Sequence, residues 1–150
     1  MNMLVSDDFE DLCNSLNEHG VEYVVVGGYA LAFHGAPRYT ADLDLLVGPD
    51  LDNVRRLVAA LEEFGFPPTG ITAEDIASGG RILQMGLAPT QVHVMTDVTG
   101  VTWAEVWNGS VVGRYGRCAT RFMGRTEFLK NKRAAGRPKD LADADTIESL

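Results

Sequence analysis

Hydrophobic residues recur along this chain first at helical spacing and then in short or alternating runs. Apolar side chains three or four positions apart predict helices over 6–19 and 50–64, each followed by a glycine. Between these helices, the β-branched run at 23–26 predicts a strand that is buried on both faces. A glycine pair and a short helix follow it, and alternation over 40–48 then predicts a second strand.

The second half of the chain predicts a hairpin, a further strand pair and two closing helices. Segments 82–86 and 91–98 have the pattern of strands joined by a turn, 102–109 that of a helical turn, and 110–122 that of two short strands. Helices are predicted over 128–136 and 138–150, separated by Gly136 and Pro138. We therefore expect one α/β or α+β domain over 1–150, with a mixed sheet in a core at about 20–120 and C-terminal helices at about 126–150.

Composition supports a folded cytoplasmic domain. The chain has 150 residues, of which 45% are hydrophobic and 23% charged, so disorder, collagen-like repeats and a coiled coil are disfavoured. No apolar run is long enough for a transmembrane helix, and the acidic N-terminal segment is unlike a secretory signal. Cys13 and Cys118 form no CxxC unit, so neither a zinc site nor a disulfide framework is indicated.

The net charge of -8 is unevenly distributed. Residues 1–110 hold 4 of the 13 Lys and Arg and 16 of the 21 Asp and Glu, whereas residues 111–150 hold the other 9 basic and 5 acidic side chains. Any attraction to polyphosphate or nucleic acid is therefore expected from the C-terminal third. Binding of duplex DNA across the whole surface is disfavoured.

The residues with the clearest chemical meaning lie at 27–47, GGYALAFHGAPRYTADLDLLV. A glycine pair at a helix start lets phosphate oxygens approach backbone N–H groups. Alternation on the next strand places Asp42 and Asp44 on one face, where two carboxylates can hold one or two Mg²⁺ (or Mn²⁺) ions that bridge a triphosphate. Either half alone is common as a plain turn or a solvated strand face, but the combination is typical of phosphoryl transfer.

Together the two halves resemble the nucleotidyltransferase superfamily, whose small members carry hG[GS], a short helix and then hDhDh on the next strand. The stretch is most similar to the bacterial branch that includes the nucleotidyltransferase toxins of abortive-infection toxin–antitoxin systems. The closing sequence LKNKRAAGRPKDLADADTIESL is similar to the final motif of that branch. The resemblance therefore covers both ends of the chain and leaves 50–90 and 100–125 without support.

This resemblance implies a short mixed sheet flanked by helices and Mg²⁺-dependent transfer of NMP from an NTP to an acceptor hydroxyl. Gly27 and Gly28 would hold the triphosphate, and Asp42 and Asp44 would hold the catalytic metals. Lys132 matches the lysine of the closing motif and would contact the nucleotide phosphates. The toxin branch makes tRNA or protein the favoured acceptor and suggests an antitoxin partner.

Other polar residues in the two motifs have two interpretations. Arg38 and Thr40 either touch the nucleotide or form a loop pair that positions the Asp-bearing strand. Asp140 lies in the first turn after Pro138, where a carboxylate caps a helix. It is alternatively a partner of Arg137 or Lys132.

The sequence departs from the family pattern where a later strand usually supplies a third carboxylate. Here the pattern is VHV, so His93 occupies the place expected for that acid, and Asp97 is the nearest alternative. A neutral imidazole adds no negative charge to a Mg²⁺ site. A rival hypothesis is therefore a nucleotide-binding interaction protein with weak catalysis. Small-molecule (antibiotic) modification is a third, although the chain is short for a separate acceptor domain.

Overall fold

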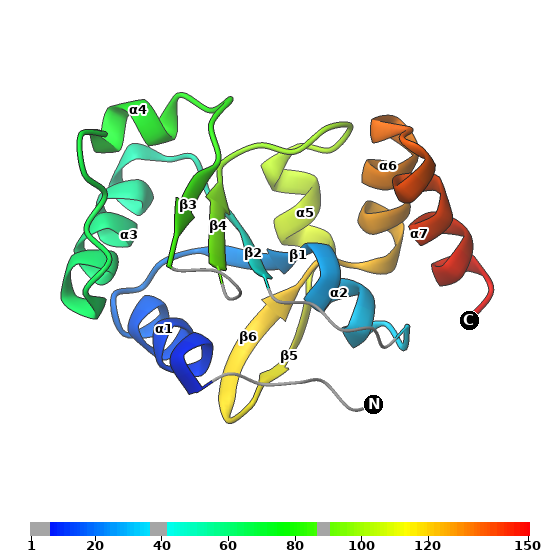
Figure 1. Ribbon diagram of the computed structural model, residues 1–150, viewed down its shortest axis with the longest axis horizontal. Coiled ribbons are helices and arrows are strands. Elements are labelled where there is room, and N and C mark those ends of the chain that lie inside the picture. The colour runs from blue at the N-terminus through cyan, green and yellow to red at the C-terminus, as the bar shows by residue number, and fades with distance from the viewer. Residues whose placement is uncertain (1–6, 37–41, 87–90) are drawn as a thin grey trace.

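The computed structural model describes residues 7–36, 42–86 and 91–150. Its first half contains α1 (Asp7–Glu18), β1 (Tyr23–Val26), α2 (Gly27–Phe33), β2 (Asp42–Val47), α3 (Leu51–Phe64) and α4 (Ala73–Ala77). Its second half contains β3 (Leu83–Met85), β4 (Gln91–Met95), α5 (Trp103–Gly109), β5 (Val111–Tyr115), β6 (Cys118–Phe122), α6 (Arg125–Ala135) and α7 (Pro138–Glu148). The predicted mixed α/β fold is confirmed (Figure 1).

The six strands form one mixed sheet in the order β3-β4-β2-β1-β6-β5. β1 runs antiparallel to β2 and parallel to β6, while β2 runs parallel to β4. The antiparallel pairs β3–β4 and β5–β6 lie at the two edges of the sheet. They confirm the predicted hairpin and the predicted final strand pair. Because β2 and β4 are parallel neighbours, side chains at matching positions of these two strands lie next to each other.

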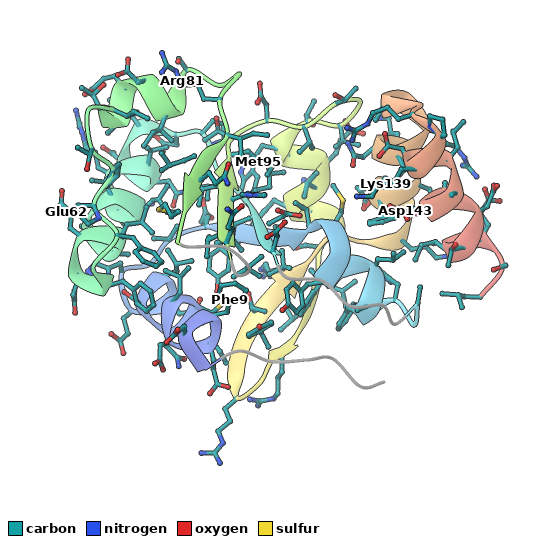
Figure 2. All side chains as sticks on the ribbon, viewed as in Figure 1. Phe9, Glu62, Arg81, Met95, Lys139 and Asp143 are labelled. Atoms are coloured by element: carbon teal, nitrogen blue, oxygen red, sulfur yellow. The ribbon has the colours of Figure 1, made fainter. Side chains whose placement is uncertain are left out.

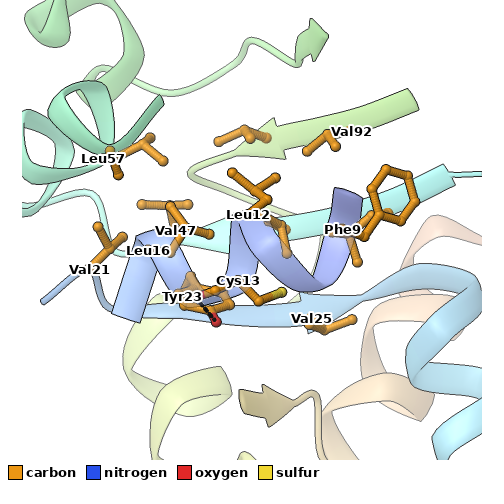
Figure 3. Packing of buried hydrophobic residues seen from close by; sticks show 14 of the residues in the cluster. Phe9, Leu12, Cys13, Leu16, Val21, Tyr23, Val25, Val47, Leu57 and Val92 are labelled. Carbon is orange, nitrogen blue, oxygen red and sulfur yellow. Dashed lines mark hydrogen bonds between the residues drawn. The ribbon is translucent and has the colours of Figure 1, made fainter. Parts of the chain in front are cut away.

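One face of the sheet packs against α1 and α3 in a large apolar core (Figure 3). Leu12 and Leu16 of α1 and Leu57 of α3 are fully buried there against strand residues that include Leu45 and Val92. The opposite face carries a second core, built with α5, α6 and α7, that includes Val24, Leu46, Val106, Phe128 and Ile147. The sheet is therefore covered by helices on both faces.

The differences from the predicted elements are local. α4 was not predicted, because its five residues bury only Ile76 and it depends on a capping box between Thr72 and Asp75. α6 begins at Arg125, three residues before the predicted start. β4 ends at Met95, so Asp97 lies beyond the strand on which it was expected. Within the described ranges, no helix is long and apolar enough to span a bilayer.

Candidate active site

The polar side chains of the candidate site lie on one face of β2 and β4. Leu43 and Leu45 of β2 are fully buried in the core beside α1 and α3, so alternation turns Asp42 and Asp44 to the opposite face. The prediction that both carboxylates share one strand face is confirmed. In the parallel β2–β4 pair, His93 lies opposite Asp44.

Asp44 is held between two neighbours. Its Oδ1 lies 2.9 Å from His93 Nδ1, and each of the two side chains is 24% exposed. Its Oδ2 lies over Gly27, where any Cβ would overlap that oxygen. Gly27 also has a φ of +67°, a conformation that favours glycine. The glycine at the start of α2 is therefore required by both its backbone angle and the Asp44 carboxylate.

The electrostatic environment of Asp44 favours a nearby cation. Burial raises the pKa of this carboxyl above its ordinary value, and His93 acts against that rise through its charge and hydrogen bond. Asp42 adds to the rise, while Lys132 opposes it more weakly. A positive charge placed beside Asp44 would therefore stabilise its ionised form.

A cavity of about 480 Å³ opens in front of Asp44. Its floor is formed by β1, β2 and β4 with the start of α2, one wall by the ends of α6 and α7 that face each other, and the other wall by the loops around 80–82 and 97–99. Figure 2 shows Met95 of the floor between the segment that carries Arg81 and the helix pair. The cavity therefore joins the N-terminal motif to the closing motif, which are about a hundred positions apart in the sequence.

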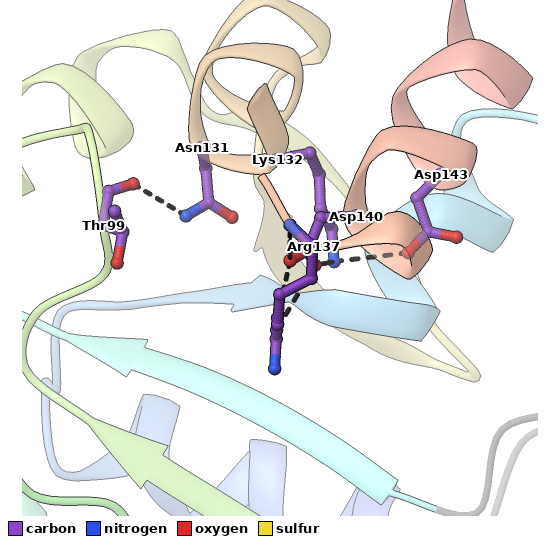
Figure 4. Close-up of polar contacts among 6 residues, drawn as sticks. All are labelled: Thr99, Asn131, Lys132, Arg137, Asp140 and Asp143. Carbon is purple, nitrogen blue, oxygen red and sulfur yellow. Dashed lines mark hydrogen bonds and ion pairs between the residues drawn. The ribbon is translucent and has the colours of Figure 1, made fainter. Parts of the chain in front are cut away.

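Lys132 projects from α6 toward this cavity and is balanced by carboxylates of α7. Its Nζ lies 3.5 Å from Asp140 Oδ1 and 3.3 Å from Asp143 Oδ2, and its side chain is 15% exposed. Arg137 Nε donates to Asp140 Oδ2 at 2.7 Å (Figure 4). Its hydrogen bonds are the main reason that the pKa of Asp140 lies below its ordinary value.

Asp140 therefore has all three roles that the sequence allowed. It contacts Lys132, it pairs with Arg137, and its Oδ2 accepts a hydrogen bond from the Arg137 backbone N–H at 3.3 Å, as a helix cap does. Figure 4 shows the Arg137 side chain extending from the start of α7 toward the strands. Arg137, Lys132 and Asp140 all line the cavity.

Two of the predicted residues that the structure describes, Gly28 and Asp42, do not line the cavity. Gly28 is buried in α2 and does not line it, so of the glycine pair only Gly27 reaches the cavity. Asp42 shares the strand face of Asp44 but lies outside the lining. Arg38 belongs, with Thr40, to the segment outside the described residues.

Asp97 lines the cavity from the loop that follows β4. Both of its carboxylate oxygens accept from the backbone N–H of Gly80 at 3.2 Å. Sequence reasoning missed the segment that this contact holds, Gly80 to Ile82, and also missed Asn131, which donates to the Thr99 carbonyl at 2.8 Å. The glycines at 79 and 80 signal a turn, but nothing in the sequence indicates which part of the fold that turn faces.

The donor set suits a cation that is shared with a bound phosphate. Two carboxylates and one imidazole lie on the same face of neighbouring strands, at Asp42, Asp44 and His93. Across the described part of the chain, no three Asp, Glu, His or Cys side chains gather as a complete metal-binding group. Mg²⁺ commonly takes only one or two protein carboxylates and completes its shell with substrate phosphates and water. These residues fit that pattern.

Comparison with solved structures gives three similar folds. A candidate nucleotidyltransferase from Thermotoga maritima superposes with a TM-score of 0.59 at 12% identity, over 94% of this chain and 88% of that one. ANT(2″)-Ia, solved with adenylyl-2″-tobramycin, gives 0.56 at 14% identity, over 94% and 86%. An antigenic nucleotidyltransferase-like protein from Paracoccidioides brasiliensis gives 0.52 at 17%, over 98% and 78%.

The chain has a nucleotidyltransferase-like fold. The likeness extends over almost the whole chain, including the stretches at 50–90 and 100–125 for which the sequence motifs offered no support. At 12–17% identity, this likeness establishes the arrangement of helices and strands. The chemistry has to be argued from the side chains that line the cavity. No family profile and no curated protein sequence matches the chain.

Proposed function

We propose that the chain is a divalent-metal-dependent nucleotidyltransferase that moves NMP from an NTP to an acceptor hydroxyl. The observation that carries this proposal is the position of Asp44, which lies over Gly27 and beside His93 on the floor of a cavity that Lys132 also lines. The same cavity is thus lined by a partly buried carboxylate, by a glycine at the start of a helix and by a lysine. The nucleotidyltransferase-like fold supports this assignment.

The proposed reaction gives a role to Asp42, Asp44, Gly27 and Lys132. Asp42 and Asp44 would hold Mg²⁺ or Mn²⁺, which supplies charge stabilisation for the attacking and leaving oxygens when bound. Gly27 would present its backbone to phosphate oxygens beside Asp44, and no side-chain hydrogen bond caps the start of α2. Lys132 would orient the triphosphate as a point charge, held in place by Asp140 and Asp143.

The proposed acceptor and the proposed cellular setting rest on the two sequence motifs. Their similarity to the abortive-infection toxin branch favours tRNA or protein as the acceptor, an antitoxin as a partner, and the cytoplasm as the location. The solved structure of ANT(2″)-Ia is a complex with adenylyl-2″-tobramycin, so a small-molecule acceptor is the competing proposal.

One observation favours the rival function, a nucleotide-binding interaction protein with little turnover. His93 Nδ1 lies 2.9 Å from Asp44 Oδ1, so the imidazole engages an oxygen that a metal would use. Binding of a cation at Asp44 would need this contact to break or His93 to become a ligand itself. Either event makes the metal site weaker than one with three carboxylates.

The test is incubation of the purified chain with each α-labelled NTP, Mg²⁺ or Mn²⁺, and one of three acceptors: total tRNA, candidate proteins or an aminoglycoside set. Label in tRNA or protein is the expected result, and label in the aminoglycoside would replace the proposed acceptor. The Asp42→Asn/Asp44→Asn variant should transfer nothing, whereas Asp52→Asn on α3, whose side chain is 75% exposed, should behave as the wild type.

Metal-dependent NTP binding without any transfer to the three acceptor classes would support the interaction protein. Absence of NTP binding under all conditions would overturn both functions. Transfer that persists in the Asp42→Asn/Asp44→Asn variant would overturn the assignment of the metal-binding carboxylates.

A further inference from the structure

The cavity wall opposite the helix pair is formed by a turn of unusual construction. Gly79 and Gly80 have φ of +81° and +74°, so two successive residues adopt a conformation that favours glycine. The Gly80 N–H donates to both oxygens of Asp97, and a Cβ at Gly79 would lie 2.9 Å from Asp97 Oδ2. Asp97 thereby fixes the course of the backbone that leads into Arg81.

Charge in the cavity is evenly divided. Among the described residues, three Asp side chains and three Lys or Arg side chains line it, namely Asp44, Asp97, Asp140, Arg81, Lys132 and Arg137. A nucleoside triphosphate carries several negative charges, and a cation without a carboxylate partner attracts it more strongly than a cation that is already paired. The carboxylate partners of each cation therefore determine how strongly that cation attracts a phosphate.

Two of the three cations are compensated by protein carboxylates. Lys132 lies within 3.5 Å of Asp140 and Asp143, and Arg137 lies 2.7 Å from Asp140. Within the described ranges, Arg81 has no carboxylate oxygen within the 4.0 Å of an ion pair. The pKa of Asp75 lies below its ordinary value mainly because of hydrogen bonds from Thr72. The charge of Arg81 contributes least to this lowering.

We propose that Arg81 binds the terminal phosphates of the nucleotide, and that Asp97 is a positioning residue that holds Arg81 at the cavity through the Gly80 N–H. This inference rests on the proposed function, since it assumes that the cavity binds an NTP. Arginine suits the role, because its planar guanidinium forms two parallel hydrogen bonds with phosphate oxygens.

The direction in which Asp97→Asn changes the nucleotide affinity distinguishes a positioning role from a purely electrostatic one. If Asp97 acted only as a negative charge beside the cavity, Asp97→Asn would tighten binding of an anionic nucleotide. If Asp97 positions Arg81, the same substitution weakens binding, because the turn loses one of the two acceptors of the Gly80 N–H. Moreover, the loss then disappears once Arg81 has been removed, since residues that act through one another are not additive.

The experiment is calorimetric titration at fixed salt and Mg²⁺ with ATP, GTP, CTP and UTP, followed by the monophosphate of the nucleoside that binds best. Arg81→Ala should weaken NTP binding about 10-fold and leave NMP binding within about 2-fold, because only the NTP carries terminal phosphates. Arg81→Lys should fall between Arg81→Ala and the wild type. Arg55→Ala, an exposed arginine of α3 paired with Glu74 outside the cavity, is the control and should change neither affinity.

Asp97→Asn should weaken NTP binding several-fold on its own and add nothing in the Arg81→Ala background. An additive loss, or tighter binding by Asp97→Asn, would overturn the positioning role. Equal NTP affinity of Arg81→Ala and Arg55→Ala would overturn the role of Arg81 while leaving the proposed function intact. A wild-type chain that binds no NTP would instead overturn the proposed function itself.

Discussion

The two faces of the β2–β4 strand pair differ in the exposure and in the chemistry of their side chains. On the side of α1 and α3, Leu43, Leu45 and Val94 are at most 1% exposed and belong to one cluster of buried hydrophobic residues. On the side of α6 and α7, Asp44 and His93 each keep 24% exposure and contact each other at the floor of the cavity. The same strands therefore serve as core on one face and as a chemical surface on the other.

The comparison indicates how stability and function are divided in this chain. The face beside α1 and α3 removes large aliphatic side chains from water, which is the main favourable contribution to folding. The face beside α6 and α7 holds a carboxyl whose pKa is raised by burial, which is unfavourable for folding at neutral pH and favourable for binding a cation. Substitutions on the two faces should consequently affect different measurements.

The largest expected effect is on the free energy of unfolding. Leu45→Ala removes a fully buried side chain and should cost about 2–5 kcal/mol, without changing NTP affinity while the protein stays folded. Asp44→Asn on the adjacent position should change stability by about 1 kcal/mol or less, because it also removes the cost of a buried charge. Urea unfolding of both variants checks this, and equal destabilisation would contradict the division between the faces.

A smaller effect should distinguish two glycines with the same backbone angle. Gly20 and Gly27 have φ of +70° and +67°, so alanine at either position should cost about 1–2 kcal/mol of backbone strain. Only at Gly27 would the new Cβ displace the Asp44 carboxylate, whereas the nearest atom at Gly20 is 4.0 Å away on Arg56. Gly27→Ala should therefore weaken metal-dependent NTP binding and Gly20→Ala should not. Similar NTP affinities for both variants would contradict the close approach of Asp44 to Gly27.

The next effect concerns the helix pair. Lys132→Ala should weaken NTP binding about 10-fold and reduce its dependence on salt, because a charge that faces the phosphates is lost and Asp140 and Asp143 are left without it. Arg55→Ala should do neither, since its guanidinium lies outside the cavity. Titration at two salt concentrations measures both quantities. Equal losses in the two variants would point to general surface charge instead.

The smallest expected effect sharpens the role of His93. His93→Asp places a hard oxygen ligand beside Asp44 and removes the imidazole contact, so Mg²⁺-dependent NTP binding should tighten by a few-fold. The gain is limited by repulsion between the neighbouring carboxylates. Metal titration at constant NTP measures it. Unchanged Mg²⁺ dependence would show that position 93 does not reach the metal.

Much of the fold followed from local patterns in the sequence. The alternation in β2 was sufficient to place Asp42 and Asp44 on one face, because neighbouring leucines had to enter the core. Glycine at the end of α3 and proline at the start of α7 marked helix boundaries that the structure confirms. α4 escaped notice because a five-residue helix has too few apolar positions to show a period.

The cavity could be predicted only in part. The two motifs identified Gly27, Asp44 and Lys132, all of which line it. Arg81 and Asn131 were missed because their place depends on which strands and loops meet in space, and no local period records that. The sequence suggested Asp140 as a partner of either Arg137 or Lys132, whereas the packing of α6 on α7 brings both Asp140 and Asp143 to Lys132.

The central claim is that the polar face of β2 and β4 binds a nucleotide together with a divalent cation. The most direct measurement is NTP binding with and without Mg²⁺ or Mn²⁺, for the wild type and for the Asp42→Asn/Asp44→Asn variant. The wild type should bind NTP more tightly with the metal, and the variant should lose that metal-dependent increment while keeping the unfolding midpoint of a folded protein. A variant that retains the full increment would contradict the claim.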